Sequence, residues 1–236
     1  MAILEITGVD SGYGEVQILW DMAISLEEGR LTSLVGANGV GKTTLLRTVM
    51  GSIKPWKGSI KYRGEEIGHM PAYRKPELGL VLVPEGRQLF TDMTVEENLE
   101  MGATNRRARA HVARNLERVY ELFPRLAERN RQEAGTLSGG EQQMLAVARG
   151  IMAEPTILMF DELSLGLAPV LVLNLFQTLK QLKEEGLTML LVEQNVHMAL
   201  SVSDYAYVVS EGRVTLEGPA GQIAKDESVQ KAYLGI

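Results

Sequence analysis

The sequence predicts an α/β fold built on a mainly parallel sheet. Strand-like and helix-like segments alternate from Thr156 to Ser201, which is the pattern of a parallel sheet covered by helices. Short apolar or alternating runs interrupted by glycines occupy the first third of the chain and predict strands there. The stretch between these regions has a helical pattern and no convincing strand. We therefore expect a helical lobe inserted into the α/β domain.

The individual elements follow from local patterns of apolar residues. Four short runs predict the first strands: Ile3–Ile6, Met22–Leu26, Leu31–Val35 and Ser59–Tyr62. A further strand at 79–83 is ended by Pro84, and helical patterns cover 42–50 and 95–101. The later alternation predicts a strand at 156–160, a helix at 169–184, a strand at 187–193 and a helix at 196–201. Glu211-Gly212 is a hairpin turn signal between strands expected at 205–209 and 213–217.

The helical lobe carries an excess of positive charge. Between Thr104 and Arg131 it has three glutamates and these eight arginines: Arg106, Arg107, Arg109, Arg114, Arg118, Arg125, Arg129 and Arg131. A basic run can bind nucleic acid or anionic lipid. We favour a solvated helix face, because an apolar stripe at helical spacing runs through Val112, Leu116, Val119 and Phe123.

Composition excludes several classes of protein. With 236 residues, 45% hydrophobic residues and a formal net charge of −6, the chain resembles an ordinary globular domain rather than a disordered, collagenous or coiled-coil protein. The absence of cysteine excludes disulfides, a cysteine nucleophile and a thiolate metal site. The acidic balance argues against nucleic acid as the main partner. Met1–Glu5 meets an acid too early for a signal peptide, and the longest apolar runs are far shorter than the ~20 residues of a membrane span.

A glycine-rich segment points to phosphate binding. Gly36-Ala37-Asn38-Gly39-Val40-Gly41-Lys42-Thr43 fits the P-loop pattern and lies between a predicted strand and a predicted helix. Glycines let the backbone N–H groups turn toward a phosphate chain, and the helix that follows presents its positive end to it. Lys42 supplies a charge for the β- and γ-phosphates, and the Thr43 hydroxyl suits Mg²⁺. The residues expected at the nucleotide are Gly36, Asn38, Gly39, Gly41, Lys42, Thr43 and Thr44.

Two acids follow a run of four apolar residues, 157–160, that is typical of a strand buried on both faces. Asp161 would sit at the carboxyl end of this strand, where ligands bind in open α/β sheets. A P-loop enzyme needs an acid there to hold the metal, and often a second acid to act on water. We expect Asp161 in the Mg²⁺ shell and Glu162 as the residue that polarises the attacking water.

The segment Leu137-Ser138-Gly139-Gly140-Glu141-Gln142-Gln143 has capping-box spacing, so Ser138 is expected to cap a helix that runs to about Met152. A cap accounts for Ser138 and Glu141 but not for the two glycines. This segment resembles the signature motif of ATP-binding-cassette (ABC) ATPases, and the resemblance covers essentially the whole chain.

The resemblance implies a P-loop NTPase (ABC ATPase) core with a mainly parallel sheet and an N-terminal antiparallel β subdomain. In this scheme 1–94 and 153–236 form the core and about 95–152 form the helical subdomain with the signature motif. ATP and Mg²⁺ are the implied cofactors. Tyr13 would stack on adenine, and two cassettes would pair head to tail. Ser138, Gly139, Gly140 and Glu141 would then act on the nucleotide of the partner subunit.

One subgroup is resembled most, the second ATPase subunit of branched-chain amino acid importers. The residues that carry this likeness are 83–87 (VPEGR), 94–99 (TVEENL), 164–169 (SLGLAP), 192–195 (VEQN) and 231–235 (KAYLG). Transmembrane permease subunits, a second ATPase and, indirectly, a periplasmic solute-binding protein are the implied partners. The chain would be cytoplasmic and peripheral on the inner face of the membrane. ATPases of urea and amide importers are similar, so the solute stays open.

Four positions depart from the general family pattern. Glu85 stands where most members have Gln, Gln194 where most have His, and Ala168 where most have Asp. These three match the subgroup, whereas Leu163 replaces a proline that is usual even there. The resemblance still implies catalytic roles for Glu162, Lys42, Gln194 and Glu85, with Thr43, Asp161 and Glu85 at the metal. We expect a heterodimer with a paralogue and unequal ATP sites, although a homodimer is possible.

Two other functions remain open. An exporter ATPase of the same architecture would use the same residues. A soluble ABC ATPase acting on DNA or ribosomes is disfavoured, because such proteins carry long insertions, tandem cassettes or basic domains. The single short cassette with its net charge of −6 has none of these, so we expect no nucleic acid partner.

Overall fold

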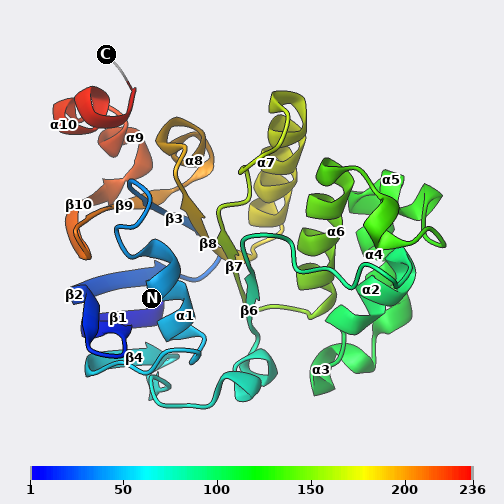
Figure 1. Cartoon of the computed structure of the whole chain (residues 1–236), viewed down its shortest axis with the longest axis horizontal. Helices are drawn as coiled ribbons and strands as arrows, with labels where there is room; N and C mark the ends of the chain where they lie inside the picture. Colours follow the sequence, from blue (N-terminus) through cyan, green and yellow to red (C-terminus); the bar gives the residue numbers. More distant parts are fainter. Residues whose placement is uncertain (1, 235–236) are drawn as a thin grey trace.

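In the computed structural model, residues 2–234 are described; Met1 and Gly235, which belong to two of the segments discussed above, lie outside this range. The strands form a four-stranded sheet and a six-stranded sheet (Figure 1). The first has the order β2-β1-β4-β5, with β1 Ala2–Tyr13, β2 Val16–Glu27, β4 Lys57–Tyr62 and β5 Glu65–Glu66. The second has the order β10-β9-β3-β8-β7-β6, with β10 Arg213–Pro219, β9 Tyr205–Ser210, β3 Leu31–Val35, β8 Thr188–Glu193, β7 Ile157–Asp161 and β6 Leu80–Val83.

Pairing in the six-stranded sheet is parallel except for β10, which runs antiparallel to β9. The N-terminal sheet is antiparallel throughout. Both features confirm the expected fold class. The first two strands are longer than predicted, at 12 residues each, because their pairing continues through several bulges. A bulge interrupts the period-2 pattern by which strands are recognised. The two-residue strand β5 was not predicted.

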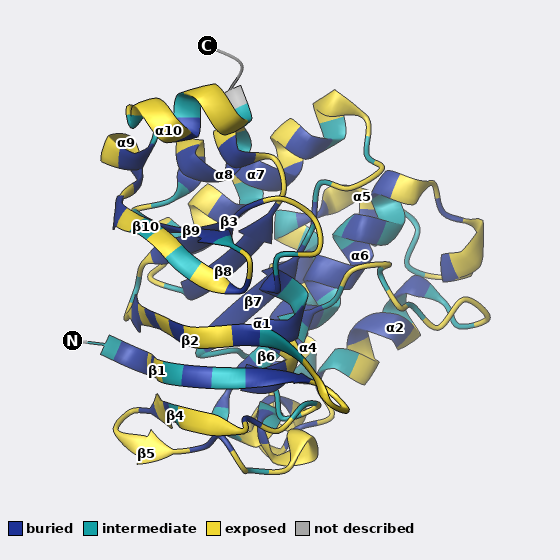
Figure 2. Cartoon of the chain, turned by 60° about the vertical axis from the view of Figure 1, so that its left-hand side comes forward, coloured by how far each residue is buried: buried dark blue, intermediate teal, exposed yellow. Residues whose placement is uncertain are grey.

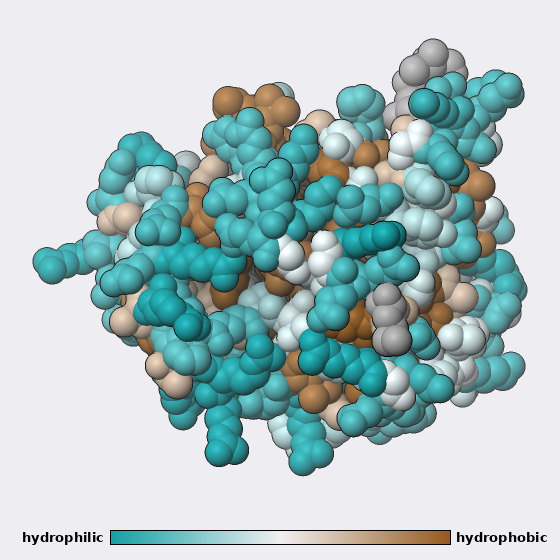
Figure 3. Space-filling model, turned by 180° about the vertical axis from the view of Figure 1, so that it is seen from behind, coloured by the Kyte–Doolittle hydropathy of each residue, from teal (hydrophilic) through white to brown (hydrophobic). Residues whose placement is uncertain are grey.

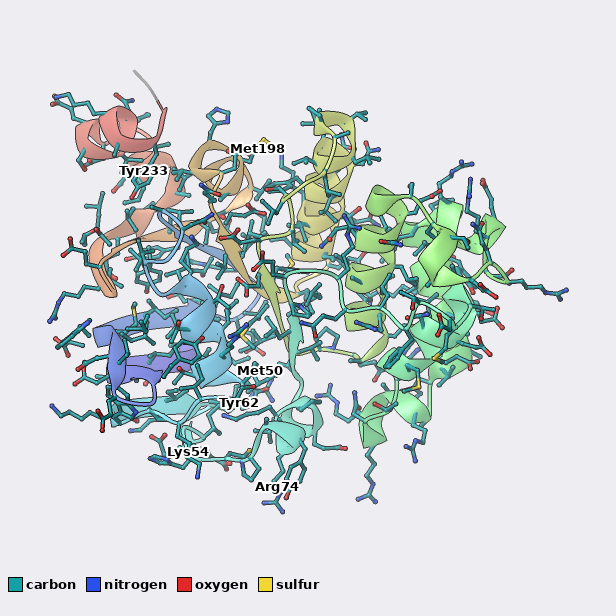
Figure 4. The ribbon with its side chains drawn as sticks, in the orientation of Figure 1. Met50, Lys54, Tyr62, Arg74, Met198 and Tyr233 are labelled. Carbon is teal, nitrogen blue, oxygen red and sulfur yellow. The ribbon has the colours of Figure 1, made fainter. Side chains whose placement is uncertain are left out.

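Two cores lie on the two faces of the six-stranded sheet. Side chains alternate between faces along a strand, so Ile157 and Met159 of β7 belong to one core and Leu158 and Phe160 to the other. The first core is shared with β1, β2 and α1 (Lys42–Val49), and the second with the helices on the opposite face. Figure 2 shows β3, β7 and β8 as buried. In Figure 4, Met50 packs against the first core and Met198 against the second.

The helical lobe follows β6 and precedes β7. Its five helices are α2 Val95–Gly102, α3 Arg106–Arg109, α4 Val112–Leu122, α5 Pro124–Glu128 and α6 Gly139–Met152. Described residues 95–152 contain no strand, and α6 begins and ends where the capping pattern placed it. Val119 and Phe123 are buried and Val112 and Leu116 are partly buried against the second core, as the apolar stripe predicted. The division into separate folding units stays a prediction.

The remaining helices cover the second core and complete the C-terminal region. They are α7 Pro169–Glu184, α8 Val196–Val202, α9 Ala220–Ile223, α10 Glu227–Val229 and a π-helical turn at Gln230–Leu234. The last three were not predicted, because they are too short to show a period. The face of the molecule behind Figure 1 is mostly hydrophilic, with small separate apolar patches (Figure 3). Among the described residues, none of the helices combines the length and the apolar character that a membrane crossing requires.

Candidate active site

The P-loop joins β3 to α1, and its glycines are required by the backbone path. Gly41, which caps α1, has φ 107, and a Cβ there would lie 2.8 Å from Leu19 Cδ2. Gly36 has φ 156, and a Cβ there would lie 2.3 Å from the Val209 carbonyl oxygen. Residues with a side chain rarely adopt such conformations. The loop therefore packs directly against β9 and β2 and leads into the first turn of α1, where free N–H groups can receive an anion.

Lys42 is buried at the base of this loop, with an exposed fraction of 4%. Its Nζ donates hydrogen bonds to the carbonyl oxygens of Gly36 and Ala37, at 2.8 and 2.9 Å. The same Nζ lies 3.4 Å from Glu162 Oε1. The ammonium is thus held under the loop, and its charge is shared with the acid that follows β7.

Asp161 ends β7 on the same face as Ile157 and Met159, which is the face covered by α1. The Thr43 hydroxyl therefore reaches it, and donates a 3.0 Å hydrogen bond to Asp161 Oδ1. Burial raises the pKa of Asp161, and the nearby charges of Glu162 and Glu85 raise it further. A cation bound at this carboxylate would favour its ionised form.

Glu162 has an unusual backbone conformation, with φ 50. Its N–H donates to the Val192 carbonyl oxygen of β8, at 2.9 Å. The left-handed turn directs its side chain to Lys42 instead of continuing the alternation of β7. Glu162 also lines a cavity of about 350 Å³ together with Glu85 and with Gln142 and Gln143 of α6.

Gln194 directly follows β8 and is exposed. It lines a second cavity, of about 470 Å³, together with Glu162, Glu193 and Tyr233. Tyr233 comes from the C-terminal π-helical turn, which Figure 4 places beside α8 and α9. The cavity therefore places Gln194 beside the loop that follows Glu162 and beside Tyr233 of the C-terminal turn.

Tyr13 lies at the end of β1 and is 44% exposed. Its hydroxyl accepts a 3.1 Å hydrogen bond from Arg47 Nη1 of α1. The exposed ring is therefore tethered near the P-loop helix, which suits contact with a flat ligand bound at the loop.

The helix-cap segment Ser138–Glu141 is not joined to the P-loop. Ser138 N–H and Oγ donate to Glu141 Oε2, at 3.0 and 2.7 Å, and Glu141 N–H returns a hydrogen bond to Ser138 Oγ. Arg129 forms an ion pair with Glu141 at 3.1 Å. Within residues 2–234, no hydrogen bond or salt bridge links this segment to residues 36–44. Figure 1 shows α6 and α1 well separated, with β6 and β7 between them.

The structure accounts for the unexpected Leu163 and places one further residue, Glu193, next to the site. Leu163 is fully buried in the second core, so its role is packing. Glu193, which sequence reasoning missed, is 1% exposed and binds Ser164 with both carboxylate oxygens. Burial raises the pKa of Glu193, and the Ser164 hydrogen bonds oppose this effect. The only signal in the sequence was a charged residue at the end of an apolar strand.

The donor set at the P-loop suits a magnesium ion. Thr43, Asp161 and Glu85 offer hydroxyl and carboxylate oxygens, and Mg²⁺ takes one or two such groups together with water and substrate phosphates. A dedicated protein cage is not required for this mode of binding. Accordingly, the described residues contain no cluster of three or more His, Cys, Asp or Glu side chains arranged around a metal position.

Comparisons with known proteins agree with this geometry. The profile of the family described as "ABC transporter" matches residues 19–164. The high-affinity branched-chain amino acid transport ATP-binding protein BraG of Pseudomonas aeruginosa is 43% identical over 233 residues, which are 99% of this chain and 100% of that protein. The probable branched-chain amino acid transport ATP-binding protein LivF of Archaeoglobus fulgidus is 35% identical, over 99% of both chains. BraF, also from Pseudomonas aeruginosa, is 32% identical over 99% of this chain and 98% of its own.

Solved structures give the same answer for the fold. A nucleotide-free ATP-binding cassette from an ABC transporter matches with a TM-score of 0.86 and 26% identity, over 97% of each chain. The ADP conformation of a cassette of an ABC transporter matches with a TM-score of 0.85 and 26% identity, over 100% of each chain.

Proposed function

We infer that this chain, which belongs to the ABC transporter family, is the ATPase subunit of a branched-chain amino acid importer. The convergence of Lys42, Thr43, Asp161 and Glu162 on one P-loop supports hydrolysis of ATP. The full-length likeness to BraG and LivF, whose names specify branched-chain amino acid transport, supports the solute class.

We assign roles to the site residues from their positions. The P-loop N–H groups and Lys42 hold the β- and γ-phosphates, Asn38, Gly39 and Thr44 belong to this cradle, and the Tyr13 ring stacks on adenine. Thr43, Asp161 and Glu85 hold Mg²⁺, which would neutralise phosphate charge during transfer. Glu162 orients the attacking water from its place beside Lys42. Gln194 donates a hydrogen bond to the γ-phosphate, since glutamine can donate without becoming charged.

The separation of Ser138–Glu141 from the P-loop supports a head-to-tail dimer. In such a dimer, Ser138, Gly139, Gly140 and Glu141 of one subunit complete the site on the other. BraG and BraF of one organism are both related to this chain, which supports pairing with a paralogue. We further propose that the two ATP sites hydrolyse at unequal rates. Single-turnover hydrolysis measured at each site of the reconstituted pair tests this, and equal rates would contradict it.

The chain acts with membrane subunits and lies on the cytoplasmic face of the membrane. A groove of about 510 Å³ between β6 and the helical lobe offers a place for such a partner, because it is open and carries the half-exposed apolar side chains of Phe90 and Met101. Movement of the helical lobe and of the loop at Glu85 would be transmitted to the membrane subunit bound at this groove. Nucleic acid is not a partner in this scheme.

Reconstitution tests the function directly. Vesicles containing the chain, its paralogue and the co-encoded membrane subunits should accumulate labelled leucine with Mg-ATP, in the presence of the solute-binding protein. Urea and short amides serve as competing substrates, and a complex with Glu162→Gln in both ATPases is the inactive control. Uptake of urea or amides instead of leucine would reassign the solute. ATP-dependent movement of solute only in the outward direction would make the complex an exporter.

A further inference from the structure

We propose that Glu193 is a positioning residue for Glu162 and acts through Ser164. This inference rests on the proposed function, because it concerns how the water-orienting acid is held during ATP hydrolysis. It gives a role to Glu193, a buried acidic residue that was not among the site residues assigned a role above.

Both carboxylate oxygens of Glu193 accept hydrogen bonds from one loop residue, Ser164. Ser164 N–H donates to Oε1 at 2.9 Å, and Ser164 Oγ donates to Oε2 at 2.8 Å. Glu193 is only 1% exposed, so water cannot easily replace these bonds. Removing the partners of a buried carboxylate is strongly destabilising, so these two bonds fix the position of the loop at Ser164.

Glu193 lies where the three strands of the site meet. It ends β8, the strand between β3 and β7, and it pairs in register with Val35, the last residue of β3 before the P-loop. Val192, the preceding residue, pairs with Asp161 and accepts the N–H of Glu162 at 2.9 Å. The end of β8 thus holds the chain at Glu162 through a backbone bond and again at Ser164 through a side chain.

The backbone of Glu162 needs such support. Its φ of 50 is a conformation that residues with a side chain rarely adopt, and it persists only when the surroundings determine it. If Ser164 were released, Glu162 could relax toward an ordinary conformation, and its carboxylate would leave the 3.4 Å contact with Lys42. A misplacement of about 1 Å at a catalytic group can lower a rate by up to about 100-fold.

The same arrangement links Glu162 to Gln194. Gln194 is the next residue after Glu193 and lines the same cavity as Glu162 and Ser164. A shift of the Gln194 backbone would pull on the Glu193 carboxylate and hence on the loop at Ser164. We therefore expect Glu193 to affect the rate of hydrolysis, and not the affinity for ATP, since Glu193 itself is not among the residues of the P-loop.

The test is a variant series in the full-length chain, assembled with its ATPase partner. Glu193→Ala should lower kcat at least about tenfold and change KM for ATP by less than about threefold. Glu193→Gln keeps an oxygen that can accept the Ser164 N–H, and it should retain at least a third of the wild-type kcat. Thr188→Ala is the matched control, because Thr188 is buried at the other end of β8 and accepts Gly29 N–H at 2.9 Å, away from the site. It should keep kcat within twofold.

Dependence on Glu162 separates positioning from general structural damage. In the Glu162→Gln background, single-turnover rates with and without Glu193→Ala should agree within about twofold, since there is no carboxylate left to position. An undiminished tenfold loss in that background, or an unchanged kcat in Glu193→Ala alone, would overturn the proposal. If Glu193→Ala fails to fold, Ser164→Ala takes its place with an expected loss of at least threefold. A wild-type complex without ATPase activity would instead refute the proposed function.

Discussion

The hydroxyl of Thr43 donates a hydrogen bond of 3.0 Å to Asp161, which joins the first turn of α1 to the end of β7 across 118 positions of sequence. This contact brings the phosphate-binding loop and the acid strand into one site. Burial raises the pKa of Asp161, and the negative charges of Glu162 and Glu85 raise it further; a cation bound there would favour the ionised carboxylate.

Substitutions of Thr43 test the metal assignment. Thr43→Val removes the hydroxyl at nearly constant shape, and we expect the Mg²⁺ concentration for half-maximal ATPase activity to rise at least about tenfold, because one oxygen ligand is lost. Thr43→Ser keeps the hydroxyl and should stay within about threefold of wild type. A Mg²⁺ titration of ATPase activity measures both. Equal Mg²⁺ dependence in Thr43→Val and wild type would remove Thr43 from the metal.

Glu162→Gln should retain ATP binding and lose nearly all turnover. The amide keeps the size of the side chain but cannot accept a proton, so we expect kcat to fall at least about 100-fold with the Kd for ATP within about threefold. Glu154→Gln is a matched control, since Glu154 has φ 51 and lies outside the site, where it binds Arg114. Normal turnover of Glu162→Gln in a phosphate-release assay would exclude the role given to Glu162.

Much of the framework followed from local patterns. Helix α7 begins and ends at the predicted residues, and α6 begins after the predicted cap Ser138. These segments combine a long apolar period with a clear start signal, such as Pro169 at the first position of α7. The P-loop and Asp161 were equally accessible, because a fixed spacing of glycines and a buried strand ending in an acid both reflect local chemistry.

Contacts between distant segments could not be predicted in the same way. The pairing of Glu193 with Ser164 depends on the register of β7 and β8, and the Tyr13–Arg47 contact depends on how β1 packs on α1. The bulged halves of β1 and β2 were missed because their irregular register hides the strand period. Lys75 is a further case, since nothing in its neighbourhood along the chain indicates complete burial.

Lys75 should make stability depend on pH. Burial lowers its pKa from 10.5 to about 8, so between these values the unfolded chain binds more protons than the folded chain. The free energy of unfolding should therefore rise with pH across this window, by about 1–3 kcal/mol in total, and the penalty of the charged lysine is fully present below pH 8.

Urea unfolding at intervals from pH 7 to pH 10 measures this effect. Lys75→Met removes the titrating group, along with its 2.6 Å hydrogen bond to the Ile67 carbonyl oxygen, and serves as the reference. The unfolding free energy of the wild type minus that of Lys75→Met should become more positive as the pH rises. Parallel pH dependences would mean that Lys75 keeps an ordinary pKa.

Among the basic residues of the lobe, those of α3 should contribute most to assembly with the membrane subunits. Among the described residues, salt bridges pair Arg114, Arg118, Arg125 and Arg129 with glutamates. The other four arginines of the lobe make no such pair in the described part of the chain; they are Arg131 and the three arginines of α3, Arg106, Arg107 and Arg109. If α3 lies near the membrane subunits, changing these three arginines to Glu should lower assembly at least about tenfold at physiological salt.

The matched control places the same charge change elsewhere on the lobe. Changing Arg114, Arg118 and Arg125 to Glu alters the net charge equally, and exposed ion pairs contribute little to stability. Co-purification with the membrane subunits compares the two triple variants. Full assembly of the α3 variant would place the partner surface elsewhere.

The chain has two capping boxes of the same geometry, and comparing them distinguishes a structural role of Ser138 from a role in hydrolysis. Thr94 caps α2 and Ser138 caps α6, and in each the side chain accepts an N–H from a glutamate three residues later. Thr94→Ala and Ser138→Ala should each lower the free energy of unfolding by about 1 kcal/mol, since each loses one cap. Only Ser138→Ala should also lower the ATPase rate of the assembled dimer, at least about tenfold, because Ser138 would contact the nucleotide of the other subunit. Urea unfolding and ATPase assays on the same preparations measure both, and equal rates in the two variants would make Ser138 a helix cap alone.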